Sequence, residues 1–503
     1  MLDIGKIHRK EYELDTDRSC PVIIAEAPGR IHFLGELAPS LNDDNSAKNS
    51  PAGRRSAGET SENSALQAQN RNNSTNSGLQ NEPKSGFFLS AAIDRVINMA
   101  VSYRKDSSFR FYAADVNERK RSTLINLKYK REDRWANHIK PAIYLFNEMN
   151  PPIKGLNFSF CGDIPQHIGL ASSLAIEIAA AVALRSLLRV QMNDFTLAYK
   201  LQEAHLALFG NCPPIADYIV CMMARKDQFL VIDSSEGDVK LIKSPFGRFK
   251  FLIVDSRVPR FGAENEIAWR RADIIKGLEL LSQKRQGKSF KDFASSDLLE
   301  VLGDFPEQIR RRSMHIVEEI RRVNEAKDAL ERNDLVSFSK IINHSHESLR
   351  DLYEISCPEV DWLVKRAQEI EGTAGSRMTG LGFGGCTYTI IRRELAEEYS
   401  KRMEEYERIF GFRSVIHEVK IATRARVISE KAAPAETGLR GGTSKTKNTA
   451  KTAGTRKESS RSCTSGNFAS GSSNVSSRGT CKKETSRSKK NKKDTSTTKR
   501  KGA

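Results

Sequence analysis

The sequence predicts a protein of mixed α and β structure, because strand-like and helical patterns both recur along it. Short, largely apolar runs predict buried strands at 22–27 (VIIAEA) and 251–256 (FLIVDS). The run LAIEIAAAVALRSLL predicts a helix at 174–188, and the spacing of charged and apolar residues predicts two more at 273–286 and 316–332. No repeat of 20 to 50 residues is visible.

Two segments differ in composition from the rest. Residues 40–85 contain mostly Asn, Ser, Gly, Gln, Lys and Glu, with three Leu as the only large aliphatic residues. Such a segment buries too little surface to offset its ordering entropy, so we expect a mobile insertion. Residues 429–503 are rich in Lys, Ser, Thr and Gly, and we expect a disordered tail there.

The formal charge of +18 is concentrated in this tail. Residues 431–503 hold 19 Lys and Arg against 4 Asp and Glu, which leaves about +3 on the first 430 residues. The tail could contact nucleic acid or another anionic surface by charge, but it carries a single aromatic residue, Phe468, so base stacking is not expected. A solubilising tail without a partner would have the same composition.

The rest of the composition favours a cytoplasmic protein that acts without a membrane. The eight cysteines include no CxxC pair and no ligand-like spacing with His, as in reduced proteins. Residues 1–15 contain no apolar run like that of a signal peptide. The longest apolar stretch, 168–188, is interrupted by polar residues and predicts a buried helix, not a membrane span.

A glycine-containing segment precedes the helix predicted at 174–188. It runs Ile164-Pro165-Gln166-His167-Ile168-Gly169-Leu170-Ala171-Ser172-Ser173. A Gly and small hydroxyl residues at a helix N-terminus expose backbone N–H groups at the positive end of the helix dipole, which suits a phosphate, and a serine there can reach a phosphate-bound Mg²⁺. An ordinary serine-capped helix after a glycine turn would give the same pattern.

Two further segments each fit either a ligand site or an ordinary structural element. Four glycines lie within Gly380-Leu381-Gly382-Phe383-Gly384-Gly385-Cys386, before the strand TYTII at 387–391. They would let the backbone approach a ligand closely, or simply form a hairpin. In Ala27-Pro28-Gly29-Arg30-Ile31-His32-Phe33-Leu34-Gly35-Glu36, a cation and a carboxylate flank a short apolar run. Taken alone, Arg30 and Glu36 would make a surface salt bridge.

Taken in chain order, 27–36, 164–173 and 380–386, the three segments resemble the three motifs of the GHMP small-molecule kinases. Three more segments resemble the galactokinase branch: Phe88–Asp94, Ser345–Asp361 and Gly375–Gly380. The resemblance covers residues 21–39 and 86–425. It implies an α+β, two-domain fold with the active site between the domains, in a monomer that uses ATP and Mg²⁺. The domains would be an extension at 1–20, an N-terminal domain at 21–245 containing the insertion 40–85, a C-terminal domain at 246–428 and the tail 429–503.

The resemblance also implies roles for individual residues. Asp217, in Gly210-Asn211-Cys212-Pro213-Pro214-Ile215-Ala216-Asp217, matches the family's base on the sugar hydroxyl, and Arg30 matches the arginine that keeps this base ionised. Glu36 matches a group that binds a sugar hydroxyl. The ATP and phosphate contacts would be Pro165, Gly169, Leu170, Ala171, Ser172 and Ser173; the metal ligand would be Ser173; and Gly384 and Gly385 would contact the substrate.

Four positions depart from the family pattern. After Glu36 the family has a His and an Asp that contact the sugar, where this chain has Leu37-Ala38-Pro39-Ser40; the acid could be displaced to Asp43 or Asp44. The family's metal-binding Glu is replaced by His205. Glu203 lies two residues away, which is about 200° around a helix, so it would not substitute.

The other two departures are Ile267, where the family has a sugar-contacting Tyr, and Pro213-Pro214, where it has Cys-Gly. The phosphate side is therefore kept better than the sugar side. Two functions fit this pattern: ATP-dependent phosphorylation of galactose or a related hexose at its anomeric hydroxyl, or regulatory binding of nucleotide or sugar without turnover.

Overall fold

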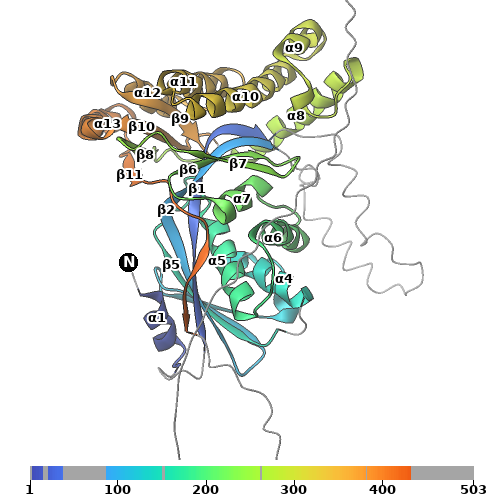
Figure 1. Cartoon of the computed structure of the whole chain (residues 1–503), viewed down its shortest axis with the longest axis vertical. Helices are drawn as coiled ribbons and strands as arrows, with labels where there is room; N and C mark the ends of the chain where they lie inside the picture. Colours follow the sequence, from blue (N-terminus) through green and yellow to red (C-terminus); the bar gives the residue numbers. More distant parts are fainter. Residues whose placement is uncertain are drawn as a thin grey trace, which may run out of the picture. The chain divides into compact units, whose positions relative to one another are not determined.

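The computed structural model describes residues 3–14, 21–37, 86–149, 153–260, 263–380 and 382–431. The expected insertion at 40–85 lies outside the described residues, as does the expected tail except for 429–431, which form the end of a strand. Two sheets with helices packed against them make up the described chain (Figure 1). The mixed α and β class that the sequence predicts is confirmed.

The first sheet contains eight strands of the described chain, in the order β12-β1-β2-β5-β3-β4, with β6 paired to β2 and β7 paired to β6. Its strands are β1 (Val22–Leu37), β2 (Gly86–Tyr103), β3 (Ser108–Ala113), β4 (Glu118–Thr123), β5 (Leu156–Gly162), β6 (Gln228–Asp233), β7 (Asp238–Lys243) and β12 (Arg426–Lys431). The helices of this half are α1 (Ile4–Glu11), α4 (Lys140–Met149), α5 (Ser172–Leu187), α6 (Asp194–Phe209) and α7 (Ile215–Met223).

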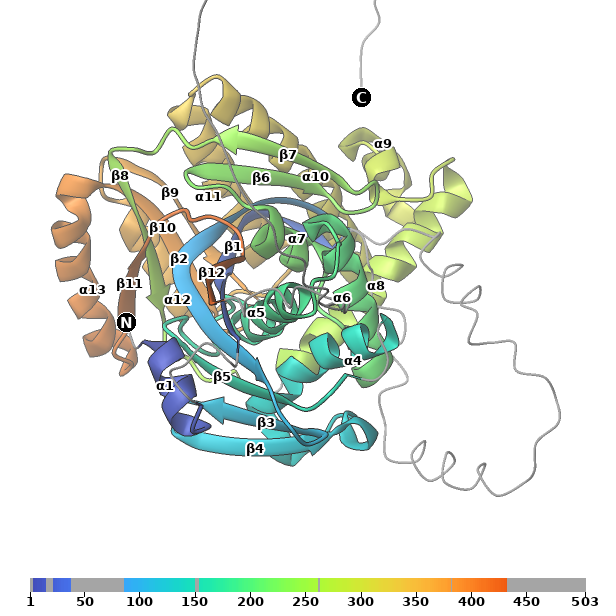
Figure 2. The same cartoon turned by 60° about the horizontal axis from the view of Figure 1, so that its bottom comes forward.

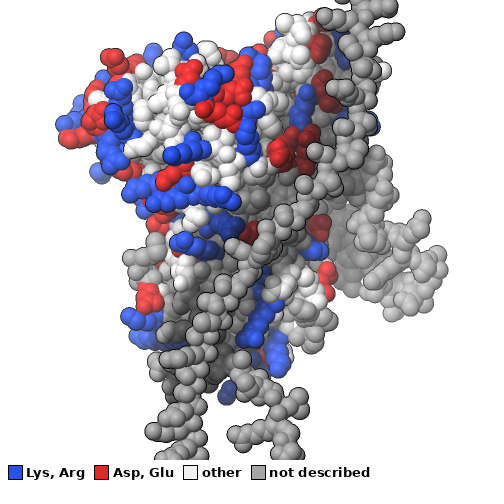
Figure 3. Space-filling view, viewed as in Figure 1, with Lys and Arg blue, Asp and Glu red and all other residues white. Residues whose placement is uncertain are grey.

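The second sheet contains four strands of the described chain, in the order β11-β8-β10-β9. They are β8 (Phe249–Asp255), β9 (Thr373–Thr379), β10 (Cys386–Arg392) and β11 (Val415–Val419). Its helices are α8 (Ala263–Lys284), α9 (Ser295–Val301), α10 (Glu307–Glu331), α11 (Leu335–Asp351), α12 (Pro358–Gln368) and α13 (Ala396–Phe410). Over the helices at the top of Figure 3, acidic and basic side chains are intermixed.

The predicted elements are present, with longer bounds. Strand β1 continues ten residues beyond the predicted 22–27, because it pairs with β2 over its whole length. Helix α8 begins at Ala263 instead of 273. The expected domain boundary at 245/246 falls between the last strand of the first half, β7, and β8, although β12 returns to the first sheet and pairs with β1.

Aromatic side chains join the two sheets in one core. The ring of Phe33 on β1 packs edge-on against Phe229 of β6, Phe251 of β8 and Tyr388 of β10, with ring centroids 5.1, 5.8 and 4.9 Å away. The Tyr388 hydroxyl also donates a hydrogen bond to the Phe33 carbonyl at 2.7 Å. Strand β1 is therefore held from both halves of the fold.

The β1–β2 ladder is irregular at the segment that carries the sequence motif. Its register shifts between Pro28 and Arg30, and again between His32 and Leu34. Proline has no N–H for a ladder hydrogen bond, and such interruptions redirect side chains. Arg30 and His32, two residues apart between these shifts, project to the same face of the strand.

Helix α1, which the sequence analysis did not predict, packs on the sheet face opposite to α5 (Figure 2). Its Ile4 lies in a small cluster with Val22, Ala100 and Cys161, whereas the neighbouring Val101 belongs to the main core. Within the described chain, no helix is both long enough and apolar enough to cross a membrane.

The anchor of α1 is His8, which is fully buried. Its Nδ1 lies 2.8 Å from the Ser159 hydroxyl and its Nε2 lies 2.9 Å from the Ser102 hydroxyl. Burial lowers the pKa of His8 from 6.5 to about 3, with a smaller contribution from the charge of Arg9. The folded state therefore resists protonation that the unfolded chain accepts.

Because the pKa of His8 is lower in the folded than in the unfolded state, we expect a loss of stability in acid. Between pH 6.5 and 3 the unfolded state binds one more proton at His8, so His8 contributes about 1.4 kcal/mol of lost stability per pH unit of acidification. His8→Asn should cost about 1–2 kcal/mol at pH 8 and remove that slope. Urea unfolding followed by circular dichroism at pH 8, 6 and 5 measures both, and equal slopes for the two proteins would contradict this account.

Candidate active site

A cavity of about 500 Å³ lies where both halves of the described chain meet. Helices α5, α6, α7 and α8 and strands β1 and β9 contribute to its wall. The lining includes Arg30, His32, Gly35, Phe88, His138, Gly169, Ala171, Ser173, Glu177, His205, Asp217, Ile267, Arg377, Thr379 and Gly380.

Arg30 and Asp217 form a two-pronged ion pair in this cavity. The Arg30 Nε donates to Asp217 Oδ1 at 2.8 Å and Nη2 donates to Oδ2 at 2.6 Å, while Nη1 donates to the Gly169 carbonyl at 2.6 Å. Asp217 lies in the first turn of α7, where the helix dipole favours a negative charge. The arginine thus joins strand β1, helix α7 and the glycine turn before α5.

His32 is a third member of this cluster, and the sequence analysis missed it. Its Nε2 lies 2.6 Å from Asp217 Oδ1 and its Nδ1 lies 2.6 Å from the Ser90 hydroxyl. The ring also packs near that of Phe88, with centroids 4.7 Å apart. The alternation of a strand was the available signal, because it places His32 on the same face as Arg30.

These contacts determine the charge of Asp217. Burial alone would raise the pKa of the carboxyl, but the Arg30 guanidinium and the His32 ring hold that pKa well below its usual range. Burial, together with the Arg30 charge, lowers the pKa of His32. We therefore assign a neutral His32 that donates from Nε2 to an ionised Asp217 and accepts the Ser90 hydroxyl proton at Nδ1.

The predicted phosphate-binding segment reaches the cavity in part. Gly169, Ala171 and Ser173 line it, whereas Pro165, Leu170 and Ser172 are not among its lining residues in the described chain. Ala171 is the N-cap of α5, has a positive φ of 62° and makes no side-chain cap. The N-terminus of α5 therefore has no side-chain cap from its N-cap residue and no acidic residue in its first turn.

The glycine-rich segment before β10 packs directly on this turn. A Cβ on Gly169 would lie 2.9 Å from the Gly380 Cα, and both glycines have positive φ, of 84° and 85°. Cys386 Sγ lies 2.9 Å from the Ile168 carbonyl. Gly380 lines the cavity, but Gly384 and Gly385 are not among its described lining residues; the Gly384 carbonyl accepts from the Ser256 hydroxyl.

Comparisons with known proteins identify the family. Residues 137–225 match the GHMP kinases N terminal domain and residues 326–408 match the GHMP kinases C terminal model. A protein of Treponema pallidum (strain Nichols) named "Putative galactokinase" is 37% identical over 349 residues, which cover 68% of this chain and 87% of that protein. The chain belongs to the galactokinase branch of the GHMP kinases.

Further relatives agree with this assignment. A galactokinase of Roseiflexus sp. is 29% identical over 362 residues, covering 71% of this chain and 92% of that protein. The crystal structure of Lactococcus lactis galactokinase complexed with galactose superimposes with a TM-score of 0.70 at 21% identity, over 84% of this chain and 99% of that one, and so supports the fold. The protein is a galactokinase-like sugar kinase, an ATP-dependent phosphotransferase.

His205 stands at the position where the resemblance implies a metal-binding glutamate. His205 lines the cavity, and its Nδ1 lies 2.6 Å from Oε2 of Glu177, a fully buried residue whose other oxygen accepts from the Tyr218 hydroxyl at 3.0 Å. Burial raises the pKa of Glu177. The described residues contain no group of three or more His, Cys, Asp or Glu that could hold a metal ion.

The remaining sequence-predicted positions divide into three groups. Ile267 and Pro213-Pro214 line the cavity of this kinase. Glu36 pairs with Phe87 in the β1–β2 ladder, which fixes its backbone next to Gly35. Residues 38–40, Asp43 and Asp44 lie outside the described residues.

His32 gives the first test of this site. Replacing His32 by Leu removes a donor from Asp217, and a hydrogen bond to a charged group is worth about 1.5–3 kcal/mol, or about one to two pKa units. The pKa of Asp217 should rise, so the acid limb of kcat/KM should move to higher pH. His32→Gln, which keeps an amide donor, should shift the limb less; superimposable profiles for wild type and His32→Leu would contradict the assignment.

Proposed function

We propose that this kinase transfers the γ-phosphoryl group of ATP to the anomeric hydroxyl of galactose or a related hexose. The observation that carries the proposal is the Arg30–Asp217 pair, held in the cavity beside the turn before α5. The relatives named galactokinase give the same class of substrate. Phosphoryl transfer needs a positioned nucleophile and neutralised phosphate charge more than covalent chemistry.

Asp217 is the proton acceptor in this mechanism. Its Oδ1 accepts from Arg30 Nε and His32 Nε2, whereas Oδ2 accepts from Arg30 Nη2 among the described residues. A carboxylate oxygen can accept two hydrogen bonds, so Oδ2 keeps a lone pair for the sugar hydroxyl. The proton moves to Asp217 as the sugar oxygen bonds to the γ-phosphorus and the bond from that phosphorus to the bridging oxygen breaks, releasing ADP. The Arg30 guanidinium stabilises the negative charge that develops nearby.

The nucleotide phosphates would lie at the positive end of α5, over Gly169, Ala171 and Ser173. Mg²⁺ is usually held by one or two protein groups, phosphate oxygens and water, so the Ser173 hydroxyl fits as a ligand of an ion that ATP carries in. The ion would neutralise phosphate charge. His205, bonded to Glu177, supplies no oxygen ligand in place of the family's glutamate.

The apolar side chains on the sugar side of the cavity are the reason for proposing a related hexose as well as galactose. Phe88, Ile267, Ile274 and Ile355 give the cavity an apolar wall. Ile267 cannot make the hydrogen bond of the tyrosine that the family has there. A sugar with fewer or differently placed hydroxyl groups than galactose suits such a wall, because an unpaired buried polar group is costly.

A second candidate function is regulatory binding of nucleotide or sugar without turnover on the same fold. The observation that favours it is the closed His205–Glu177–Tyr218 network at the metal position. Calorimetry that detects nucleotide binding, together with an absence of product, would support this function.

We also propose that the protein is cytoplasmic. Cys161, Cys221 and Cys386 are buried thiols, which suits a reducing cytoplasm. Residues 432–503, nearly all of the basic tail, lie outside the described residues, so contact of that tail with nucleic acid or an anionic surface stays a prediction.

The test is a panel of hexoses, amino sugars and polyols with Mg·ATP, in which ADP release is measured and products are identified by ³¹P NMR. Wild type should phosphorylate galactose or a related hexose at the anomeric position. Asp217→Asn keeps the size but removes the base, so kcat should fall by about 10²–10⁴-fold. Absence of phosphorylation across the panel would overturn the proposed function.

A further inference from the structure

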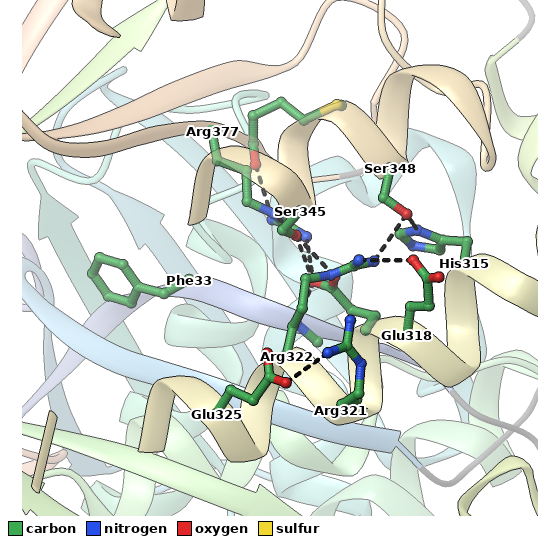
Figure 4. A network of polar contacts seen from close by, with 12 residues as sticks. Phe33, His315, Glu318, Arg321, Arg322, Glu325, Ser345, Ser348 and Arg377 are labelled. Carbon is green, nitrogen blue, oxygen red and sulfur yellow. Dashed lines mark hydrogen bonds and ion pairs between the residues drawn. The ribbon is translucent and has the colours of Figure 1, made fainter. Parts of the chain in front are cut away.

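A fully buried carboxylate, Glu319 of α10, lies at the centre of a polar network outside the cavity. Its Oε2 accepts from Arg322 Nε at 2.7 Å, and its Oε1 accepts from Arg377 Nη2 at 3.1 Å. The Ser345 hydroxyl lies 2.8 and 2.9 Å from the two oxygens and accepts from Arg377 Nε at 2.8 Å. Figure 4 shows Arg322, Ser345 and Arg377 converging beside strand β1, which carries Phe33.

One contact of Glu319 leaves its own half of the fold. Glu319 Oε1 accepts the backbone N–H of Gly35 on β1 at 3.0 Å. Gly35 has a φ of 101°, and a Cβ there would lie 2.0 Å from the Phe87 carbonyl, so the position tolerates only glycine. The buried carboxylate therefore binds the backbone of β1 at a residue with unusual geometry, next to Glu36.

Two more side chains of the second half hold the same stretch of β1. The Thr379 hydroxyl of β9 donates to the His32 carbonyl at 3.2 Å, and the Tyr388 hydroxyl of β10 donates to the Phe33 carbonyl at 2.7 Å. Together with Glu319 at Gly35, these contacts hold the backbone from 32 to 35. Of the three, the contact at Gly35 is made by an ionised group, and a hydrogen bond to a charge is stronger than a neutral one.

The charge of Glu319 is secured by its partners. Burial alone would raise the pKa of its carboxyl, but Arg377 and Arg322 hold that pKa well below its usual range. Arg377 and Gly35 both line the cavity, whereas Glu319 does not. Among the described residues, Gly35 and Arg377 are thus the contacts through which Glu319 reaches the cavity wall.

We propose that Glu319 is a positioning residue for the phosphoryl acceptor: through the Gly35 N–H and Arg377 it fixes the end of β1 and one wall of the cavity on the sugar side. This inference rests on the proposed function for the identity of the acceptor as a sugar. The nucleotide side, built on the turn before α5, receives no contact from Glu319 in the described chain. The sugar and nucleotide sites should thus respond differently to loss of its charge.

The adjacent Glu318 provides a matched control. It pairs with the same Arg322, at 3.1 Å, but its side chain is 29% exposed, and in the described chain Gly35 and Arg377 hydrogen-bond to Glu319. Glu318→Gln and Glu319→Gln remove the same charge from neighbouring positions of one helix. In Glu319→Gln the amide N–H₂ must face donors of Arg322 or Arg377, so the hydrogen bond to the Gly35 N–H is weakened.

The experiment compares steady-state kinetics of both variants with wild type, using the best sugar of the panel. Glu319→Gln should lower kcat/KM for the sugar by about 10²-fold through a higher sugar KM, as expected for a displacement of about 1 Å, and leave the ATP KM within about twofold. Glu318→Gln should change neither by more than about twofold. Equal rises of both KM values in Glu319→Gln, or an equal effect of Glu318→Gln, would overturn the proposal.

Amide hydrogen exchange at Gly35 gives a second readout that needs no turnover. Glu319→Gln should speed exchange there, and Glu318→Gln should leave it at the wild-type rate; wild-type exchange in Glu319→Gln would overturn the proposal. If wild type phosphorylated no sugar, the proposed function would fail on that result, and exchange would decide the positioning role. Should Glu319→Gln not fold, Ser345→Ala removes one bridging hydroxyl and serves in its place. It should raise the sugar KM by a smaller factor and leave the ATP KM unchanged.

Discussion

The site of this kinase is organised around one ion pair, between Arg30 on β1 and Asp217 on α7. Two buried charges are costly to remove from water, and they are tolerated here because each finds several partners. The arginine also binds the Gly169 carbonyl, so a single guanidinium joins the strand, the helix and the turn that would hold phosphate. His32 completes the carboxylate's shell and leaves one oxygen able to accept a proton.

The two sheets and their glycine turns hold this ion pair in place at the cavity. Register shifts in β1 place Arg30 and His32 on the cavity side, and the close approach of Gly169 to Gly380 brings the two halves together at its wall. Backbone with positive φ at these glycines is strained for other residues and is retained where geometry matters. The second half then holds β1 by its backbone through Glu319, Thr379 and Tyr388.

The sequence predicts those parts of the site that are contiguous along the chain. Arg30, the turn before α5 and the glycines before β10 lie in short motifs whose composition indicates close backbone approach or charge. His32 and Asp217 are 185 residues apart, and that contact follows from the packing of helix α7 against strand β1. Glu319 lies in a run of charged residues typical of an exposed helix face, so its burial is a tertiary effect. Glu177, a lone acid in an apolar helix, was a signal that could have predicted a buried partner.

The central claim is that Arg30 and Asp217 act as one unit, and a double-mutant cycle tests it most directly. Arg30→Ala, Asp217→Asn and the combined variant are compared with wild type in kcat/KM for the best sugar. If Arg30 acts mainly by holding and charging the base, the double variant should lose far less activity than the product of the two single losses. Losses that multiply, for example about 10³ and 10³ giving about 10⁶, would show independent roles and contradict the account.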